Sequence, residues 1–205
     1  MKKNILTIIF LLPLLAFSQE NKAKTILDKL SDKTKTYTTI EAHFINSFTS
    51  IEAGVNEQQN GKLFLKNNSY RLELENQTIM SDGETNWFIL NDDQEVNITE
   101  ADEEEGFSPS SIFTIYENGY KYKFIKEENN KYFIELFPKE EGMFSKLIMV
   151  INKTKMEIEE LSMVDKNNSI YTYKISKFIK NHELPNDYFN FNTNKYADYD
   201  IIDLR

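Results

Sequence analysis

The chain has 205 residues, with 24 lysines and arginines against 33 acidic residues and a formal net charge of −9. This acidic balance argues against binding to nucleic acid or to an anionic membrane, and the absence of cysteine excludes disulfides, thiolate metal sites and cysteine nucleophiles. Only two histidines, His43 and His182, are available for metal or relay chemistry, whereas 15 Phe and 11 Tyr predict an interior rich in aromatic rings.

The first 18 residues have the pattern of a secretory signal peptide. Lys2 and Lys3 precede a short apolar run over 5–15, and Ala16-Phe17-Ser18 places small residues before a cleavage site at Gln19. A membrane anchor is the alternative interpretation, but a spanning helix needs about 20 apolar residues and polar residues follow this run at once. We therefore expect cleavage after Ser18, which leaves a single domain over 19–205.

Helices are predicted at two places. In the first, over 20–37, apolar residues recur at the spacing of one helical face, namely Ala23, Ile26, Leu27, Leu30 and Tyr37. The second is a short segment over 111–118 that is too apolar for a free surface helix, because it carries Ile112, Phe113, Ile115 and Tyr116. Gly106, Pro109 and Gly119 frame this segment, and such a frame suits a movable lid that presses on an apolar surface.

The rest of the chain alternates with a period of two residues, and turns rich in Asn, Asp and Gly separate the runs. Asp82-Gly83 in particular is a hairpin signal. An all-β meander of about eleven strands is predicted, over 40–50, 61–66, 70–75, 78–81, 85–90, 95–99, 120–126, 131–137, 146–151, 156–163 and 169–178.

The alternation places one set of apolar side chains on a common face of this sheet. The members are Phe44, Leu63, Leu65, Tyr70, Leu72, Leu74, Trp87, Tyr122, Phe124, Ile134, Leu136, Leu147, Met149, Ile151, Tyr171, Tyr173 and Ile175. The opposite rows are expected to be solvated, namely Lys62, Lys66, Arg71, Glu73, Lys123, Glu135, Lys146 and Lys174. A sheet of this size must curl over its helices or pack on itself. The apolar face is then either an ordinary core or the wall of a covered cavity that would bind acyl chains.

Other candidate sites are weaker. His43 points away from its neighbour Phe44 and is expected at the surface or rim, and His182 is expected in an exposed loop. The acidic stretch 100–105 lacks the ligand order of a calcium loop and is read as solvated. There is no Gly-x-Ser-x-Gly elbow and no glycine-rich phosphate loop. We therefore predict no catalytic residue, no metal and no cofactor.

Several runs of the sequence, taken in order, resemble the LolA family of periplasmic carriers of outer-membrane lipoproteins, in a Bacteroidetes-like form. The resemblance covers nearly the whole mature chain. It is carried by the runs 37–44, 61–66, 70–73, Ser81-Asp82-Gly83-Glu84-Thr85-Asn86-Trp87, 95–98, Ser108-Pro109-Ser110-Ser111-Ile112-Phe113, 135–138, Tyr188-Phe189-Asn190-Phe191 and 200–203.

The resemblance implies a mainly β fold with two or three short helices: an unclosed, strongly curved antiparallel β-barrel of about eleven strands, with the helices as a lid on its concave face. Between lid and sheet lies a cavity for acyl chains. The family receives lipoproteins from an inner-membrane ABC transporter and transfers them to the outer membrane, where the acceptor for this chain is unknown. It acts in the periplasm, is not an enzyme and needs no cofactor, and we expect a monomer.

Two alternatives remain open at this point, a carrier of another lipid and a sensor of lipoproteins built on the same half-barrel.

The sequence departs from the family pattern at a contact that concerns the lid. Well-studied family members hold it with an arginine in the turn that this chain writes as Asn67-Asn68-Ser69, where only Lys66 is near. A lysine can donate to lid carbonyls but lacks the planar fork of an arginine, so the resemblance does not carry this closing contact over to the chain.

Overall fold

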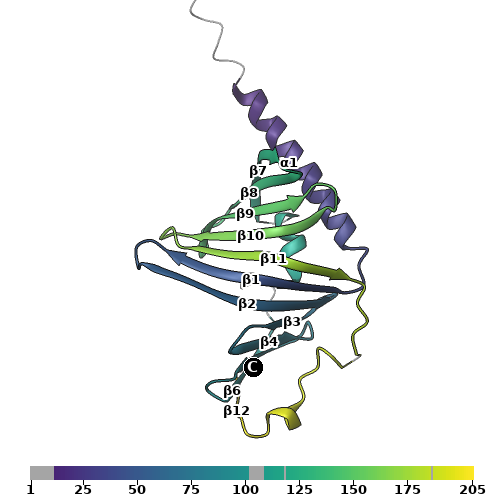
Figure 1. Ribbon diagram of the computed structural model, residues 1–205, viewed down its shortest axis with the longest axis vertical. Coiled ribbons are helices and arrows are strands. Elements are labelled where there is room, and N and C mark those ends of the chain that lie inside the picture. The colour runs from purple at the N-terminus through teal and green to yellow at the C-terminus, as the bar shows by residue number, and fades with distance from the viewer. Residues whose placement is uncertain (1–11, 102–108, 118, 186) are drawn as a thin grey trace, which may run out of the picture.

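The computed structural model describes residues 12–101, 109–117, 119–185 and 187–205, apart from the side chains of 12–18, 110 and 111. One long helix, α1, is followed by strands and three short 3-10 turns (Figure 1). The helical elements are α1 (Leu12–Thr34), η1 (Pro109–Phe113), η2 (Ile115–Glu117) and η3 (Thr193–Tyr196). The strands are β1 (Ile40–Ser50), β2 (Val55–Lys66), β3 (Ser69–Glu73), β4 (Gln77–Ser81), β5 (Thr85–Leu90), β6 (Glu95–Glu100), β7 (Tyr120–Glu128), β8 (Lys131–Pro138), β9 (Phe144–Asn152), β10 (Glu157–Asp165), β11 (Ile170–Lys180) and β12 (Asp200–Asp203).

All strands form one curved sheet in the order β12-β6-β5-β4-β3-β2-β1-β11-β10-β9-β8-β7. Neighbours pair antiparallel except β12, which lies parallel to β6. The sheet does not close, because β12 and β7 are its two edges. The predicted fold class, a mainly β, unclosed and curved sheet, is therefore confirmed. The twelfth strand, β12, is not among the eleven strands predicted from the sequence.

The helix differs from its prediction at both ends. It starts at Leu12 and ends at Thr34, so it includes part of the predicted signal peptide, and cleavage after Ser18 stays a prediction. No helix among the described residues is long and apolar enough to cross a membrane. The predicted lid helix is instead the two 3-10 turns η1 and η2. Its expected hinge at Gly106 lies outside the described residues, and so do residues 102–105 of the acidic stretch.

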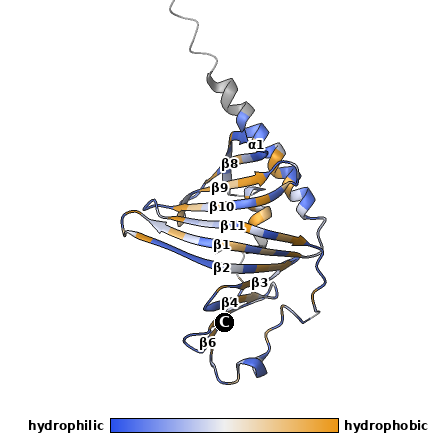
Figure 2. Ribbon diagram, viewed as in Figure 1, coloured by the Kyte–Doolittle hydropathy of each residue, from blue (hydrophilic) through white to orange (hydrophobic). Residues whose placement is uncertain are grey.

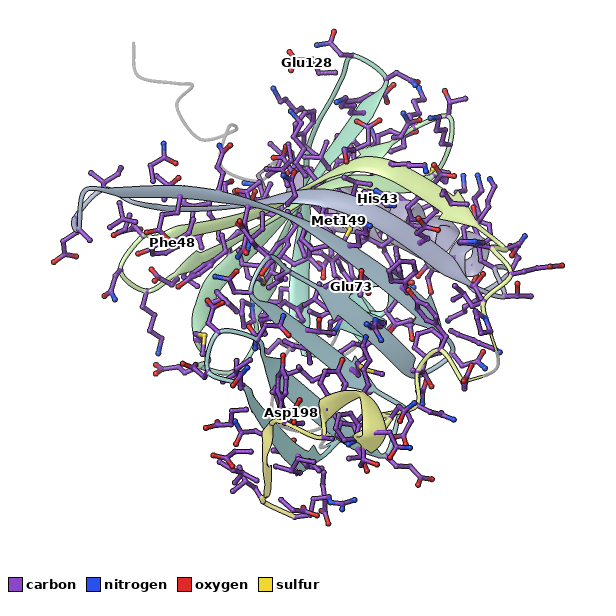
Figure 3. All side chains as sticks on the ribbon, turned by 60° about the horizontal axis from the view of Figure 1, so that its bottom comes forward. His43, Phe48, Glu73, Glu128, Met149 and Asp198 are labelled. Atoms are coloured by element: carbon purple, nitrogen blue, oxygen red, sulfur yellow. The ribbon has the colours of Figure 1, made fainter. Side chains whose placement is uncertain are left out.

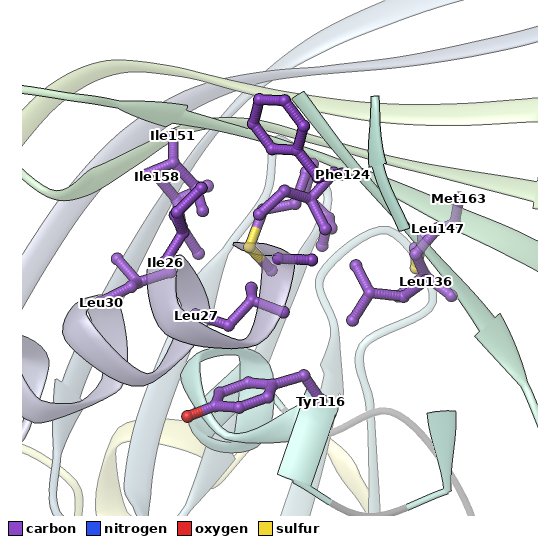
Figure 4. Close-up of a cluster of buried hydrophobic side chains, with 14 residues drawn as sticks. Ile26, Leu27, Leu30, Tyr116, Phe124, Leu136, Leu147, Ile151, Ile158 and Met163 are labelled. Carbon is purple, nitrogen blue, oxygen red and sulfur yellow. The ribbon is translucent and has the colours of Figure 1, made fainter. Parts of the chain in front are cut away.

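The inner face of the sheet, which carries Phe44 and Met149, holds the largest core. Apolar side chains of α1 pack there against rows from β7–β10, and the ring of Tyr116 lies beside the helix in the same cluster (Figure 4). Hydrophobic and hydrophilic segments alternate along the strands, as expected for a sheet whose two faces differ (Figure 2). The buried members are Ala23, Ile26, Leu27, Leu30, Tyr116, Phe124, Ile134, Leu136, Leu147, Met149, Ile151, Ile158, Leu161 and Met163.

Close packing on this face explains one glycine. Gly61 in β2 lies opposite Phe44 in β1. A Cβ atom at this position would come within 2.3 Å of the Phe44 ring and 3.0 Å of Leu74. Only glycine therefore lets the ring lie flat across the neighbouring strand.

The outer face is also apolar over β2–β6, where the C-terminal segment (187–199) covers it. In Figure 3 this segment, labelled at Asp198, runs in front of the strands. Phe191 stacks between Trp87 and Tyr196, with ring centroids 5.7 Å and 5.3 Å apart. The Tyr196 ring belongs to a second core of buried residues on this face, together with Met80, Ile89, Val96 and Ile98.

This cover corrects two predictions. Trp87 pairs with Met80 and Ile98 on the outer face, so it does not share the face of Phe44. Arg71 points outward as expected but is not solvated, because Tyr188 lies over its guanidinium at 5.5 Å and only 16% of its side chain is exposed. The physical reason in both cases is that the C-terminal segment buries an outer row that sequence alternation treats as wet.

Trp87 is the only tryptophan and therefore reports on docking of the C-terminal segment. Phe191→Ala removes the ring stacked on it. We expect a red-shifted tryptophan emission and a loss of about 2 kcal/mol in the free energy of unfolding, since Phe191 is half-buried. The matched control is Phe144→Ala in the inner core, which should destabilise the protein without moving the emission maximum. An unshifted emission in Phe191→Ala would contradict this packing.

Candidate functional site

The predicted cavity residues lie on one face, with the single exception of Trp87. Strand pairing links Leu63 to Leu72, Leu136 to Leu147, and Leu161 to Tyr173, so each such pair points to the same side of the sheet. Leu74 lies with Phe44 beside Gly61 on that side. The residues placed on the inner face are Phe44, Leu63, Leu65, Tyr70, Leu72, Leu74, Tyr122, Phe124, Ile134, Leu136, Leu147, Met149, Tyr171 and Tyr173.

The two halves of the inner face are covered unequally. Over β8–β10 the apolar side chains are buried in one cluster with those of α1, whereas Tyr122, Tyr171 and Tyr173 on the flanking strands are half-buried. Over β2–β5 a row of apolar side chains is only half-buried, and it consists of Leu63, Leu72, Leu74, Ile79 and Phe88. Ile79 and Phe88 were not predicted, and for Phe88 the reason is that its neighbour Trp87 was placed on this face, which puts Phe88 on the opposite one. The half-buried row is the candidate lipid-binding surface.

The four predicted lid residues all pack on the inner face. Ile112, Phe113 and Ile115 are half-buried against the main core, and Tyr116 is buried within it. Phe113 also packs against a smaller cluster on β1–β3 that contains Leu65 and Tyr70. Its ring therefore sits at the boundary between the half filled by α1 and the half-buried row.

Polar contacts tie the lid to α1. The Tyr116 hydroxyl donates to Asp28 Oδ1 at 3.1 Å. One residue on, Glu117 Oε1 accepts from Ser31 Oγ at 3.2 Å and from Lys35 Nζ at 3.1 Å. Among the described residues Lys66 makes no hydrogen bond to the lid. The polar contacts of Tyr116 and Glu117 therefore connect the lid to α1 and to Lys35, which directly follows the helix.

The pKa values of both partners in the contact between Asp28 and Tyr116 are shifted. The hydrogen bond from Lys24, together with that from Tyr116, holds the pKa of Asp28 below its ordinary value. Burial raises the pKa of Tyr116 above its ordinary range. Asp28 is therefore an ionised acceptor and Tyr116 a neutral donor at neutral pH, which suits the hydrogen bond between them.

The two histidines share one carboxylate on the outer face. His43 points away from Phe44, as expected, and its Nε2 lies 2.6 Å from Glu41 Oε1. His182 is exposed, as predicted, but its Nδ1 also contacts Glu41. Asn181 adds a hydrogen bond from the Thr38 amide at 2.9 Å. These contacts connect residues 181–182, which follow β11, to Glu41 in β1 and to Thr38 just before that strand. Among the described residues, no group of side chains could hold a metal ion.

A groove of about 320 Å³ lies elsewhere, where β10 and β11 separate beyond Glu160 and Lys174. Lysine and glutamate side chains line it, and Lys131 pairs with Glu159 at 2.6 Å. This polar groove is distinct from the apolar row of the inner face.

Tyr116→Phe deletes the hydroxyl that binds Asp28 and keeps the buried ring. One hydrogen bond contributes about 1 kcal/mol, so we expect amides of 112–117 to exchange hydrogen about fivefold faster. Tyr37→Phe is the matched control, since the Tyr37 hydroxyl is buried with no partner among the described residues. Equal exchange in Tyr116→Phe and wild type would show that this contact does not hold the lid.

Glu41→Gln should destabilise the protein by about 1 to 2 kcal/mol at pH 7. Hydrogen bonds from His43 and His182 lower the pKa of Glu41 from 4.5. The charged form therefore stabilises the fold above pH 4.5, and this contribution is lost as the pH falls through the lower pKa of the folded state. Urea denaturation across pH should show the gap between variant and wild type closing below pH 4.5. Glu128→Gln, in an exposed pair with Lys126, should change little at any pH.

Comparisons with known proteins agree with this geometry. A family model described as outer membrane lipoprotein carrier protein LolA matches residues 35–192. A search of curated proteins finds no significant match.

Several solved structures are similar to the chain. An uncharacterized conserved protein from Thermus thermophilus is 12% identical with a TM-score of 0.58, over 89% of this chain and 99% of its own. The LolA superfamily protein NE2245 from Nitrosomonas europaea is 10% identical with a TM-score of 0.47, over 82% and 97% of the two chains. A putative outer membrane lipoprotein-sorting protein domain from Vibrio parahaemolyticus is 10% identical with a TM-score of 0.46, over 84% and 97%.

At 12% identity the Thermus structure shows a common fold and nothing about activity. The family model is the stronger finding, because it spans well over half of the sequence. This protein therefore belongs to the LolA family of outer membrane lipoprotein carrier proteins.

Proposed function

We propose that this protein carries acylated lipoproteins through the periplasm and acts by binding alone, without catalysis or a cofactor. The observation that supports this most is the unequal cover of the inner face. The row of Leu63, Leu72, Leu74, Ile79 and Phe88 is half-buried, and the lid ring Phe113 packs at its edge. An ordinary core would bury such a row, as the apolar rows of β8–β10 are buried together with α1.

The energetics of acyl chains make a movable lid useful. Burying one methylene group gains about 0.8 kcal/mol, so several chains in a rigid pocket would bind almost irreversibly. A carrier must offset that gain by making its empty state favourable. Phe113 and its neighbours provide this when they return to the inner face, and the contacts of Tyr116 and Glu117 with α1 hold them there.

The transfer route follows the family. The predicted signal peptide 1–18 would export the chain, and an inner-membrane ABC transporter would load it. An acceptor at the outer membrane, whose identity is open, would unload it. We expect the carrier to work as a monomer, with one lipoprotein bound per chain.

Phe113→Glu tests the carrier role. Mature protein is mixed with inner-membrane vesicles that hold a triacylated lipoprotein and its transporter, and soluble complex is measured by native mass spectrometry. Wild type should form a one-to-one complex and pass the lipoprotein to outer-membrane vesicles. A carboxylate among acyl chains is strongly unfavourable, so Phe113→Glu should lower complex formation at least about tenfold. Circular dichroism should show the sheet intact.

Phe133→Glu is the matched control, because Phe133 pairs with Val150 on the opposite face, where Lys126 lies 4.8 Å from its ring. It should carry lipoprotein like wild type. Full activity of Phe113→Glu would overturn the proposal. Co-purified free lipid without a lipoprotein complex would favour a carrier of another lipid, and a complex that is never unloaded would favour a sensor.

A further inference from the structure

Asn46 is a polar residue within an aromatic part of the inner face. It lies in β1 between Phe44 and Phe48, which point to the same side of the sheet. Its partner in β11 is Tyr173 and its partner in β2 is Gln59. The rings of Phe44 and Tyr173 lie 5.6 Å apart, and those of Phe48 and Tyr171 lie 4.7 Å apart. Asn46 is therefore framed by two ring pairs.

The side-chain oxygen of Asn46 has no hydrogen-bond partner among the described residues. Oδ1 is buried, and none of these residues donates to it. A buried carbonyl oxygen without a donor is unfavourable, and most such groups in folded proteins are paired. The rings around Asn46 supply apolar contacts but no donor that reaches Oδ1. The protein therefore holds an unused acceptor on the same face of the sheet as the half-buried row, in the strand next to β2.

The chemistry of an acylated lipoprotein limits what this acceptor can bind. Hydrocarbon chains have no donor, and the ester groups of a diacylglyceryl unit are acceptors alone. Among the groups that attach the acyl chains, only the amide that joins a chain to the N-terminal amino group carries an N–H, and it lies closer to the chains than the N–H groups of the peptide. A carbonyl oxygen that is short of a donor pairs with this N–H and repels an ester oxygen in its place.

We propose that Asn46 accepts a hydrogen bond from the N-acyl amide of the bound lipoprotein and so selects N-acylated over purely ester-linked ligands. The assignment rests on the proposed carrier function. It makes Asn46 a specificity-determining residue, while the apolar row and the rings supply most of the affinity. Leucine at this position would match the surrounding rings and remove the unpaired oxygen.

Two synthetic lipopeptides test the assignment. Both carry the same diacylglyceryl thioether and the same third acyl chain. In one the third chain is joined by an amide, and in the other an ester oxygen replaces the amide nitrogen with almost no change in size. Wild type should bind the amide form about tenfold more tightly by isothermal titration. Asn46→Leu should bind both forms within about twofold and should unfold at the same or a higher temperature.

Gln59→Leu is the matched control, because Gln59 lies directly across from Asn46 on the same face. It should keep the tenfold preference. Three results would overturn the assignment while leaving the carrier function in place: equal binding of both peptides by wild type, an unchanged preference in Asn46→Leu, or an equal loss of affinity for both peptides in that variant. If wild type binds neither peptide, the carrier function itself is overturned and the assignment of Asn46 with it.

Discussion

An open sheet with apolar side chains on both faces must be covered on both faces, and this constraint determines the rest of the structure. The helix α1 packs on the inner face over β7–β10. The C-terminal segment covers the outer face over β2–β6 and ends as β12 beside β6. These two covers lie on opposite faces and toward opposite edges of the sheet. The inner face over β2–β5 is the apolar part that neither of them reaches, and the lid packs at its edge.

The part of the sheet that stabilises the fold differs from the part that is proposed to bind the ligand. Buried rows under α1 and under the C-terminal segment supply the hydrophobic free energy that keeps the sheet folded. The half-buried row of Leu63, Leu72 and its neighbours contributes less, since part of its area stays in water. A surface that the fold does not need to bury is free to take up a ligand. The same logic explains why the lid contacts are polar: a few hydrogen bonds of about 1 kcal/mol each hold it without competing with several acyl chains.

The attachment of the lid shows how this chain departs from the expectation set by its resemblance. Where an arginine in the β2–β3 turn was expected, the turn carries Asn67-Asn68-Ser69. The closing contacts come from Asp28 and Ser31 of α1 and from Lys35, which directly follows the helix. Because these contacts join the lid to the helix, the two elements cover the inner face as one layer, and Phe113 lies at the margin of that layer.

The sequence by itself determined the class of the fold, most strand positions and the face of most side chains, because a period of two residues assigns each side chain to one face. It also determined that the segment around Phe113 packs against the apolar face, since a segment so apolar does not stay free in water. Alternation failed at Trp87 and Phe88, which are neighbours and both apolar. There the strand register with Met80 and Ile98, and the cover provided by Phe191, decided which face each one takes. The partners of Tyr116 and Glu117, the shared carboxylate of His43 and His182, and the unpaired oxygen of Asn46 were likewise decided by the tertiary structure alone. Each depends on contacts, or on the lack of a donor, between segments far apart in the chain, and local sequence periodicity carries no information about such distances.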